Sequence, residues 1–220
     1  MFQKISVYSS IILILLSSCI YTSSASEEDN FPITAFEFNE ECPKVCWLGI
    51  QPSITTRSDA VAIISSSDQI VQESLQIRES GLKFEWFTDR QKRSAAWVIV
   101  AIKNDMVNSL SFGILHPITV GDFIEVFGEP NEISIELTEA PDARYIYYVL
   151  YYPELQVMIE AHNYNFSAPN ASDIPKGVII NRDFDDDRLP IWLSKKYADR
   201  QPWLGYGQTE KYLPDKPPAP

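Results

Sequence analysis

The sequence predicts an α+β fold: an antiparallel sheet built from two tandem repeats, each a helix followed by a meander of strands, with the helices on one face. Two observations lead to this prediction. The frame LGIQPSIT at Leu48–Thr55 recurs as FGILHPIT at Phe112–Thr119, 64 positions later. In both places a helical pattern and then strand patterns follow, joined by short connections that favour antiparallel pairing. A chance match of the two frames is the alternative to a duplicated unit.

The N-terminus has the pattern of a targeting segment. Ile5–Leu16 is an apolar run of 12 residues, whereas a helix that spans a bilayer needs roughly 20. Leu16–Cys19, LSSC, then resembles the bacterial lipobox, which implies lipidation of Cys19 as the new N-terminus. Two or three acyl chains anchor a protein stably, so we expect a lipid-anchored, extracytoplasmic protein at the cell membrane. The alternatives are secretion after cleavage at Ala25 and a chance cysteine in the leader.

The composition is that of an acidic globular protein. Hydrophobic residues make up 45% of the chain and aromatic residues 12%, which is enough for a sizeable core. The 30 acidic residues outnumber the 18 basic ones, and the formal net charge is −12. An acidic surface does not attract nucleic acid or anionic lipid, so we expect neither as a partner. Membrane contact is expected only through the lipid anchor, because no second apolar stretch is long enough for a membrane helix.

Cys42 and Cys46 are expected to form a structural disulfide, as an isolated cysteine pair does in an extracytoplasmic compartment. A loop this short stabilises the fold by only about 2 kcal/mol on the loop-entropy account. Zinc is a weaker alternative, because it takes four ligands and the two histidines, His116 and His162, are distant in sequence. A thioredoxin-like pair would be spaced by two residues rather than three. We therefore expect neither a metal nor a cofactor.

The first repeat begins with Thr55 as the expected helix N-cap. Apolar spacing predicts a helix over 56–64 and a second helical pattern over 70–77, which Gly81 ends. A strand over 94–103 is almost wholly apolar, so either both its faces are covered or one exposed face is unusually hydrophobic. The other strands of this repeat are expected over 82–87 and 106–114.

The second repeat has clearer helix signals. Thr119 is the expected N-cap, and Asp122 follows three residues later as a variant of the capping box. Gly128 stops the helix, and Pro130 prevents its continuation. The buried stripe of the helix is expected to consist of Phe123, Ile124 and Phe127. Strands are then predicted over 133–137, 144–152, 155–162 and 177–184.

These elements divide the chain into five predicted parts. They are a signal peptide over 1–18, a lipidated cysteine with a flexible tether and arm over 19–41, a first repeat over 42–111, a second repeat over 112–184, and a C-terminal extension over 185–220. The extension carries aromatic residues without a periodic pattern. We therefore expect it to pack on the sheet.

Pro117–Pro130, PITVGDFIEVFGEP, resembles the signature of small outer-membrane lipoproteins of the barrel-assembly accessory type. Ile118–Thr119 and Phe127–Pro130 keep the spacing of that signature, while Pro117 stands for its leading Gly and Asp122 for its amide. The duplicated helix-and-strands unit is similar to the β-lactamase-inhibitor-protein architecture. A Cys pair before Trp-x-Gly-Ile and a late Trp-x-Gly-Tyr-Gly are similar to features of uncharacterised bacterial lipoproteins. The resemblance implies the fold and the lipidation but no partner.

Catalytic patterns are weak in this sequence, which contains no Gly-x-Ser-x-Gly. His116 or His162 could serve as the general base of a hydrolase, but a solvent-facing or locally bonded histidine is the commoner case. Asp183–Arg188, DFDDDR, is expected to be a solvated loop, because it lacks the Gly and terminal Glu of a calcium-binding loop. Asn165 and Asn170 begin glycosylation sequons, which matter only in a eukaryotic host. We do not expect an enzyme.

The strongest binding candidate is the strand Tyr145–Tyr152, YIYYVLYY. Alternate residues of a strand point to opposite faces, so Tyr145, Tyr147 and Tyr151 share one face. If the helices cover the other face, this row lies open. Tyrosines suit recognition because they combine a large contact area with few rotatable bonds. The alternative is that the C-terminal extension covers the row.

The expected function is that of a lipid-anchored, non-catalytic interaction module that binds a protein or peptide through the sheet face. A binder of a small ligand or a cell-envelope glycan would use the same aromatic residues. A hydrolase based on one of the two histidines is the less favoured third hypothesis.

Overall fold

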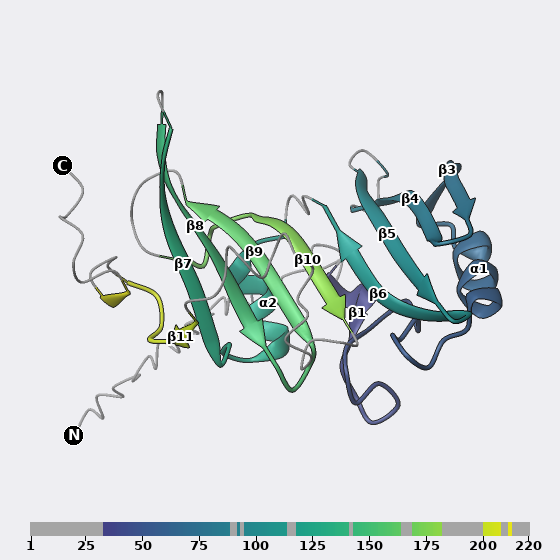
Figure 1. Ribbon diagram of the computed structural model, residues 1–220, viewed down its shortest axis with the longest axis horizontal. Helices are drawn as coiled ribbons and strands as arrows, with labels where there is room; N and C mark the ends of the chain where they lie inside the picture. The colour runs from purple at the N-terminus through teal and green to yellow at the C-terminus, as the bar shows by residue number, and fades with distance from the viewer. Residues whose placement is uncertain are drawn as a thin grey trace, which may run out of the picture.

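The computed structural model describes residues 33–88, 92, 95–113, 118–140, 143–163, 169–181, 200–207 and 211–212. Cys19 and the predicted signal peptide lie outside the described residues. The fold is α+β, as predicted, and its centre is a nine-stranded antiparallel sheet (Figure 1). The strand order is β11-β7-β8-β9-β10-β6-β5-β4-β3, and a separate two-stranded ribbon pairs β1 with β2.

Two helices each precede a run of strands along the chain. The elements are η1 (Ile33–Ala35), β1 (Phe36–Glu37), β2 (Cys46–Trp47), α1 (Arg57–Ser66), β3 (Ile70–Arg78), β4 (Gly81–Phe87), β5 (Ala95–Lys103), β6 (Met106–Phe112), α2 (Val120–Phe127), β7 (Glu132–Ala140), β8 (Ala143–Tyr152), β9 (Val157–Asn163), β10 (Pro175–Asn181) and β11 (Gln201–Pro202). Within the described part of the chain, no helix is both long enough and apolar enough to cross a bilayer.

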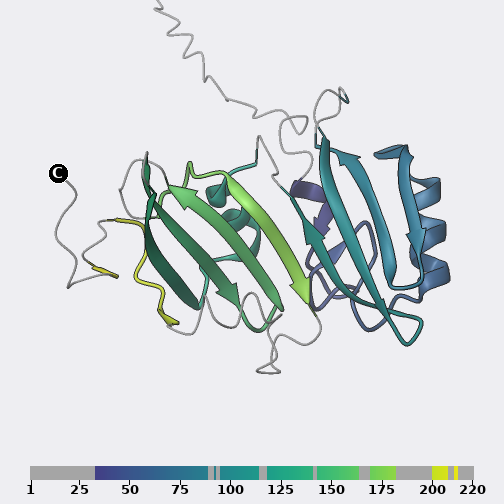
Figure 2. The same ribbon diagram turned by 45° about the horizontal axis from the view of Figure 1, so that its top comes forward.

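The sheet consists of two meanders that meet edge to edge. Strands β3–β6 follow one another as hairpins and form the first half-sheet, while β7–β10, with β11 on the edge of β7, form the second half-sheet. The seam between them is the antiparallel pair β6–β10, in which Phe112 lies opposite Val178 and Leu110 opposite Ile180. Two strands that are far apart in the sequence therefore lie side by side at the centre of the molecule (Figure 2).

The helical pattern predicted over 70–77 is wrong, because this segment forms strand β3, Ile70–Arg78. The pairing of β3 with β4 shifts register in the middle of the strand. There the Glu85 N–H donates a hydrogen bond to the Ser74 Oγ at 2.7 Å in place of a backbone partner. Such an irregularity breaks the two-residue alternation that marks a strand, and the remaining apolar spacing imitates a helix. Gly81, the expected helix end, is the first residue of β4.

The N-cap of α1 is Thr56, one residue after the predicted Thr55. The Thr56 Oγ1 accepts a hydrogen bond from the Asp59 N–H at 3.2 Å. Thr55 is buried, and its Oγ1 accepts from the Gln51 N–H at 2.8 Å, which holds the turn before the helix. The hydroxyl expected to cap the helix is therefore already used within the turn.

Helix α2 begins and ends as predicted. The Thr119 Oγ1 accepts from the Asp122 N–H at 3.3 Å, and the Asp122 Oδ2 accepts from the Thr119 N–H at 2.7 Å, which completes the capping box. Gly128 is the C-cap. Of the predicted buried stripe, Phe123 and Phe127 are buried and Ile124 is half-buried against the core. Val120, which was not predicted, is buried as well.

The predicted disulfide joins Cys42 and Cys46, whose Cα atoms lie 5.8 Å apart. Both cysteines are buried. The bridge closes the loop that leads into β2, whose first residue is Cys46. We call residues 33–47 the arm, and its two strands form a ribbon in which Phe36 pairs with Trp47.

The arm contributes to an aromatic cluster that spans the core. The Phe36 ring lies 5.1 Å from the Phe112 ring on β6 and 5.5 Å from the Phe123 ring on α2, in both cases edge-on. The Trp47 ring lies 5.2 Å from Trp86 and 5.2 Å from Phe112. Each such pair contributes about 0.5–1.5 kcal/mol beyond the burial of its area. The arm thus connects the seam strand β6 with α2.

Replacing Phe36 by Ala is expected to lower the free energy of unfolding by about 3–5 kcal/mol, because a large buried ring is lost and a cavity remains. Urea titration followed by circular dichroism measures the change. The matched control is Phe38→Ala in the same arm, where the ring is 49% exposed. The control should change the free energy by no more than about 0.5 kcal/mol. Equal losses in the two variants would contradict a central role for the Phe36 contacts.

Candidate functional site

The two faces of the sheet have different surroundings. The side chains of one face, the core face, form the larger hydrophobic cluster together with the arm and with buried residues of both helices, such as Ile64 and Phe123. We call the opposite face the outer face. It continues across the seam, because cross-strand neighbours on it run through Lys83, Ile99, Ser111, Ile179, Met158 and Tyr151.

The tyrosines of β8 divide between the two faces as predicted, but the outer row is not open. Tyr148 belongs to the core cluster, whereas Tyr147 and Tyr151 belong to a second cluster on the outer face, with Tyr145 packed against it. Tyr147 is 3% exposed and Tyr151 is 0% exposed. The other members of this second cluster are Val149, Met158 and Ile179. The prediction of an exposed tyrosine row is therefore wrong for Tyr147 and Tyr151, and Tyr145 is half-buried.

Arg200, immediately before β11, lies against this row. Its guanidinium is 4.6 Å from the centre of the Tyr151 ring, a cation–π contact, and 3.6 Å from the Glu132 carboxylate. Burial raises the pKa of the Tyr151 hydroxyl, while the charge of Arg200 acts in the opposite direction. One residue of the predicted extension thus contacts the row, while residues 182–199 lie outside the described part of the chain.

Of the two histidines, His162 on β9 lies on the outer face, opposite Tyr147, and His116 lies outside the described residues. The His162 ring stacks on Tyr145 with centroids 5.1 Å apart and meets Tyr147 edge-on at 4.7 Å. Glu160 is buried two residues earlier on the same face. These contacts make the imidazole part of the packed second half-sheet.

Of the remaining polar candidates, the structure describes only Asn170. The acidic run Asp183–Arg188 and the sequon at Asn165 lie outside the described residues, and Asn170 is exposed in the loop before β10. Within the ranges that the structure describes, no three His, Cys, Asp or Glu side chains lie where they could hold a metal ion.

The outer face is open over the first half-sheet. Trp97 and Ile99 on β5 are 43% and 41% exposed, and their cross-strand neighbours on β4 are Glu85 and Lys83. A Cβ atom at Gly113, just after β6, would collide with the Trp97 indole. The glycine therefore lets the indole lie close over the neighbouring strand, where it remains accessible to a partner.

The apolar strand predicted over 94–103 contained a signal for this surface. Val98 and Val100 point to the core face and are fully buried, whereas Trp97 and Ile99 point outward. The sequence predicted either that both faces of this strand are covered or that one exposed face is unusually hydrophobic. The structure shows the second arrangement. The sequence alone could not decide between them, because coverage of a face depends on segments far away along the chain.

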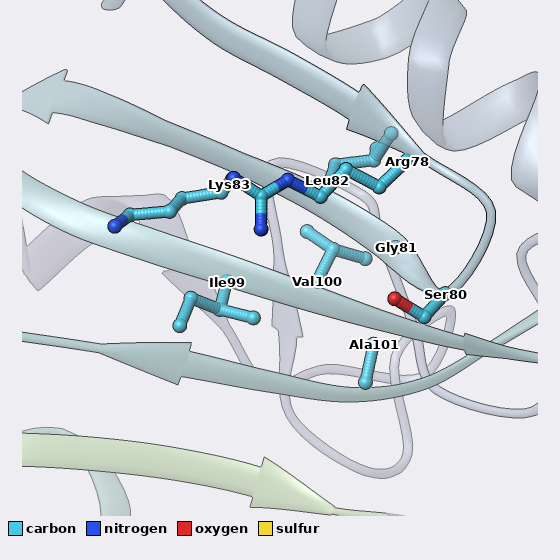
Figure 3. Close-up of a pocket in the computed structure, with 8 residues that line it drawn as sticks. All are labelled: Arg78, Ser80, Gly81, Leu82, Lys83, Ile99, Val100 and Ala101. Carbon is cyan, nitrogen blue, oxygen red and sulfur yellow. The ribbon is translucent and has the colours of Figure 1, made fainter.

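A hollow of about 360 Å³ lies next to Ile99, near the turn between β3 and β4 (Figure 3). Gly81 and Ala101 face each other across β4 and β5. Gly81 has no side chain and Ala101 only a methyl group, so the surface is low at this point. The side chains of Ile99, Lys83 and Arg78 line the hollow (Figure 3). Its lining is completed by Ser80, Leu82 and Val100.

The lining of the hollow contains two cations, Arg78 and Lys83, and no carboxylate. The Arg78 Nη2 donates a hydrogen bond to the Gln76 Oε1 at 2.7 Å, and Gln76 is the cross-strand neighbour of Lys83. In a chain with a formal net charge of −12, the hollow is a local excess of positive charge. Such an arrangement can bind an anionic group through charge-assisted hydrogen bonds.

A polar network around the half-buried Asp173 lies on the core face of the second half-sheet. The Tyr148 hydroxyl donates to the Asp173 Oδ2 at 2.6 Å, and the Asn163 Nδ2 donates to the Asp173 Oδ1 at 3.0 Å. The Asp173 carbonyl accepts from the Val120 N–H at 2.8 Å, so the loop before β10 is fixed to the start of α2. Burial raises the pKa of Asp173, and the hydrogen bond from Tyr148 partly lowers it. The only signal in the sequence was the need of a buried tyrosine hydroxyl for a partner.

No family model, no curated protein and no solved structure matches the chain. The class of the protein is therefore described from its fold and its surface. The class is an α+β domain with a nine-stranded antiparallel sheet. Its outer face is buried at one end and open, hydrophobic and partly cationic at the other.

Asp173→Asn is expected to change how stability depends on pH. Because the pKa of Asp173 is raised in the folded protein, the stability it contributes is fully present below the ordinary aspartate pKa of about 3.9 and is lost as the pH rises through the folded value. As the pH rises from acidic to neutral, the unfolding free energy of the wild type should therefore fall relative to that of the variant.

Urea titrations across this pH range measure the difference. Glu154→Gln, which removes an exposed carboxyl in the turn between β8 and β9, is the control for the loss of one acidic group. If the unfolding free energy of the wild type instead rises relative to that of Asp173→Asn toward neutral pH, the role assigned to Asp173 is wrong.

Proposed function

We propose that this protein is a non-catalytic interaction module, anchored by lipid outside the cytoplasm, that binds a protein or peptide through the outer face of its first half-sheet. The observation that carries the proposal is the exposure of Trp97 and Ile99 on a sheet face that is buried at its other end. We therefore assign the binding surface to β4 and β5 and not to the tyrosine row of β8, which lies on the same face.

Physical chemistry favours recognition at this place. Contiguous exposed apolar surface marks interaction sites, whereas single exposed apolar residues need no explanation, and tryptophan is enriched among the residues that contribute most to binding. Trp97 and Ile99 lie on β5, which pairs with β4 on one side and β6 on the other. A partner therefore meets a preformed surface, and ordering it costs little entropy on binding.

A small ligand or a cell-envelope glycan is the second candidate for this surface. The hollow of about 360 Å³ favours it, since ligand sites commonly have volumes of roughly 300–1,000 Å³. A hydrolase is less favoured, because His162 is held against two tyrosine rings in the packed half of the outer face.

We also propose that the domain consists of two tandem copies of one unit, a helix followed by four strands, with both helices on one face. The order of elements supports this, because α1 precedes β3–β6 and α2 precedes β7–β10. Each helix is capped by a threonine at or just after the repeated frame, Thr56 or Thr119. Buried side chains of both helices, Ile64 and Phe123, belong to one hydrophobic cluster. The outer face is then the face that both copies leave free of helices.

Cys19→Ser is expected to abolish incorporation of a labelled fatty acid and to release the protein from the membrane fraction, because the acyl chains supply the anchor. Metabolic labelling of cells that express wild type or variant, followed by fractionation, measures both effects. Cys42→Ser, which removes a disulfide cysteine instead, is the control and should keep the label. Equal labelling of wild type and Cys19→Ser, or no labelling of either, would remove the lipid anchor from the proposal.

A photo-crosslinking amino acid at Ile99 is expected to form a covalent adduct with a partner in the cell, detected by a gel shift and mass spectrometry. The same amino acid at Ile54, a 64% exposed residue in the turn before α1, is the matched control and should give none. Adding Trp97→Ala should reduce the adduct at least about tenfold, as expected for a tryptophan that dominates binding. Adducts at both positions or at neither would contradict the proposed surface.

A further inference from the structure

We infer that the hollow beside Ile99 is the site for a carboxylate of an extended protein segment, and that apolar side chains of the same segment lie over Ile99 and Trp97. The inference rests on the proposed function and gives the chemistry of the partner. Along β4 and β5, the cationic hollow comes first, and the exposed apolar side chains of Ile99 and Trp97 follow it.

Three successive cross-strand rows of outward residues on β4 and β5 begin at the hollow. The rows pair Gly81 with Ala101, Lys83 with Ile99, and Glu85 with Trp97. Successive rows are two residues apart, or about 6.6–6.8 Å along a strand. An extended peptide repeats its own side chains at the same interval, so alternate side chains of one segment can meet all three rows.

The first row offers space and positive charge. A Cβ atom at Gly81 would collide with the Val100 carbonyl oxygen, so this part of the floor stays without a side chain. Arg78 lies opposite Gly81 on the next strand, and its guanidinium and the Lys83 ammonium are the charged groups of the lining. A guanidinium can donate two parallel hydrogen bonds to one carboxylate, and the lysine adds a second positive charge beside it.

The second and third rows determine what lies beside the carboxylate. Ile99 and Trp97 present exposed apolar surface, so uncharged apolar side chains fit over them. Glu85 flanks Trp97 in the third row and repels a second carboxylate there. The surface therefore favours a segment with its negative charge at one end, and this polarity fixes the direction in which the segment lies along β5.

A peptide fits these features better than an anionic bilayer does. The chain has a formal net charge of −12, which opposes a broad approach to a surface of the same sign. A peptide brings a single carboxylate to a hollow of about 360 Å³ whose lining is cationic. The carboxylate is then attracted by Arg78 and Lys83 in the lining of the hollow.

Labelled synthetic peptides that alternate Val and Thr, with Glu, Gln or Lys at one end position, test the inference. Fluorescence polarisation with the full chain measures their binding. We expect the Glu peptide to bind at least about tenfold more tightly than the Gln peptide, because charge-assisted hydrogen bonds are markedly stronger than neutral ones. The Lys peptide should bind most weakly. Vesicles that contain an anionic lipid are the second probe, and the Cys19→Ser chain, which lacks the proposed anchor, should not bind them.

Variants of the lining separate charge from shape. Arg78→Gln combined with Lys83→Gln should abolish the preference for Glu over Gln while weak binding of the Gln peptide persists. Ala101→Phe fills the hollow, keeps both cations and should also abolish the preference. Lys176→Gln removes a positive charge from an exposed position on β10 and should leave the preference intact. Circular dichroism and urea titration verify that each variant is folded.

Equal binding of the three peptides, or binding of none, would overturn the inference, as would a preference for Glu that survives in the double variant. Binding of anionic vesicles that depends on Arg78 and Lys83 would assign the hollow to a membrane instead and overturn it too. If the peptides fail while the crosslink at Ile99 persists, the chemistry assigned to the hollow is wrong and the proposed interaction surface stands. If the crosslink fails as well, the proposed function fails.

Discussion

The contact of the arm with the seam between the half-sheets is the interaction on which the rest of the structure depends. The pair β6–β10 joins the halves through backbone hydrogen bonds, but a seam is stable only if its side chains are covered as well. Phe36 covers it, because its ring lies against both Phe112 on β6 and Phe123 on α2. Pairing with Trp47 fixes the position of Phe36. A short ribbon outside the large sheet thus links elements from both halves of the chain.

The two ends of the outer face differ in how much of their apolar surface is buried. At one end Tyr147 and Tyr151 are buried with their neighbours on β9 and β10, and Arg200 lies over Tyr151. At the other end Trp97 and Ile99 remain in water, at a cost of about 25 cal/mol for each Å² of apolar area that is not buried. On the described outer face, these exposed large apolar side chains lie on the first half-sheet. That asymmetry is the reason for assigning recognition to β4 and β5.

The parts of the fold that depend on neighbouring residues could be predicted from the sequence. Thr119 and Asp122 act within a single helical turn, and the disulfide joins cysteines that are close in sequence, so both predictions hold. The pairing around Ser74 depends on β4, so the spacing of β3 alone was misleading. The burial of Tyr151 and the exposure of Trp97 depend on segments far away along the chain. Sequence patterns could therefore identify the aromatic and apolar strands of the sheet, but not which of their side chains stay exposed.

The irregular pairing of β3 also bears on how copies of this protein meet. β3 is the last strand at one edge of the described sheet, and such an edge offers unpaired backbone groups to a strand of another molecule. The Ser74 hydroxyl bonds to the Val71 carbonyl at 2.6 Å, and the shift in register bends the strand locally. An incoming chain finds no long, straight edge to extend. The irregularity of β3 therefore disfavours growth of a continuous sheet from this edge when copies of the protein meet at high concentration.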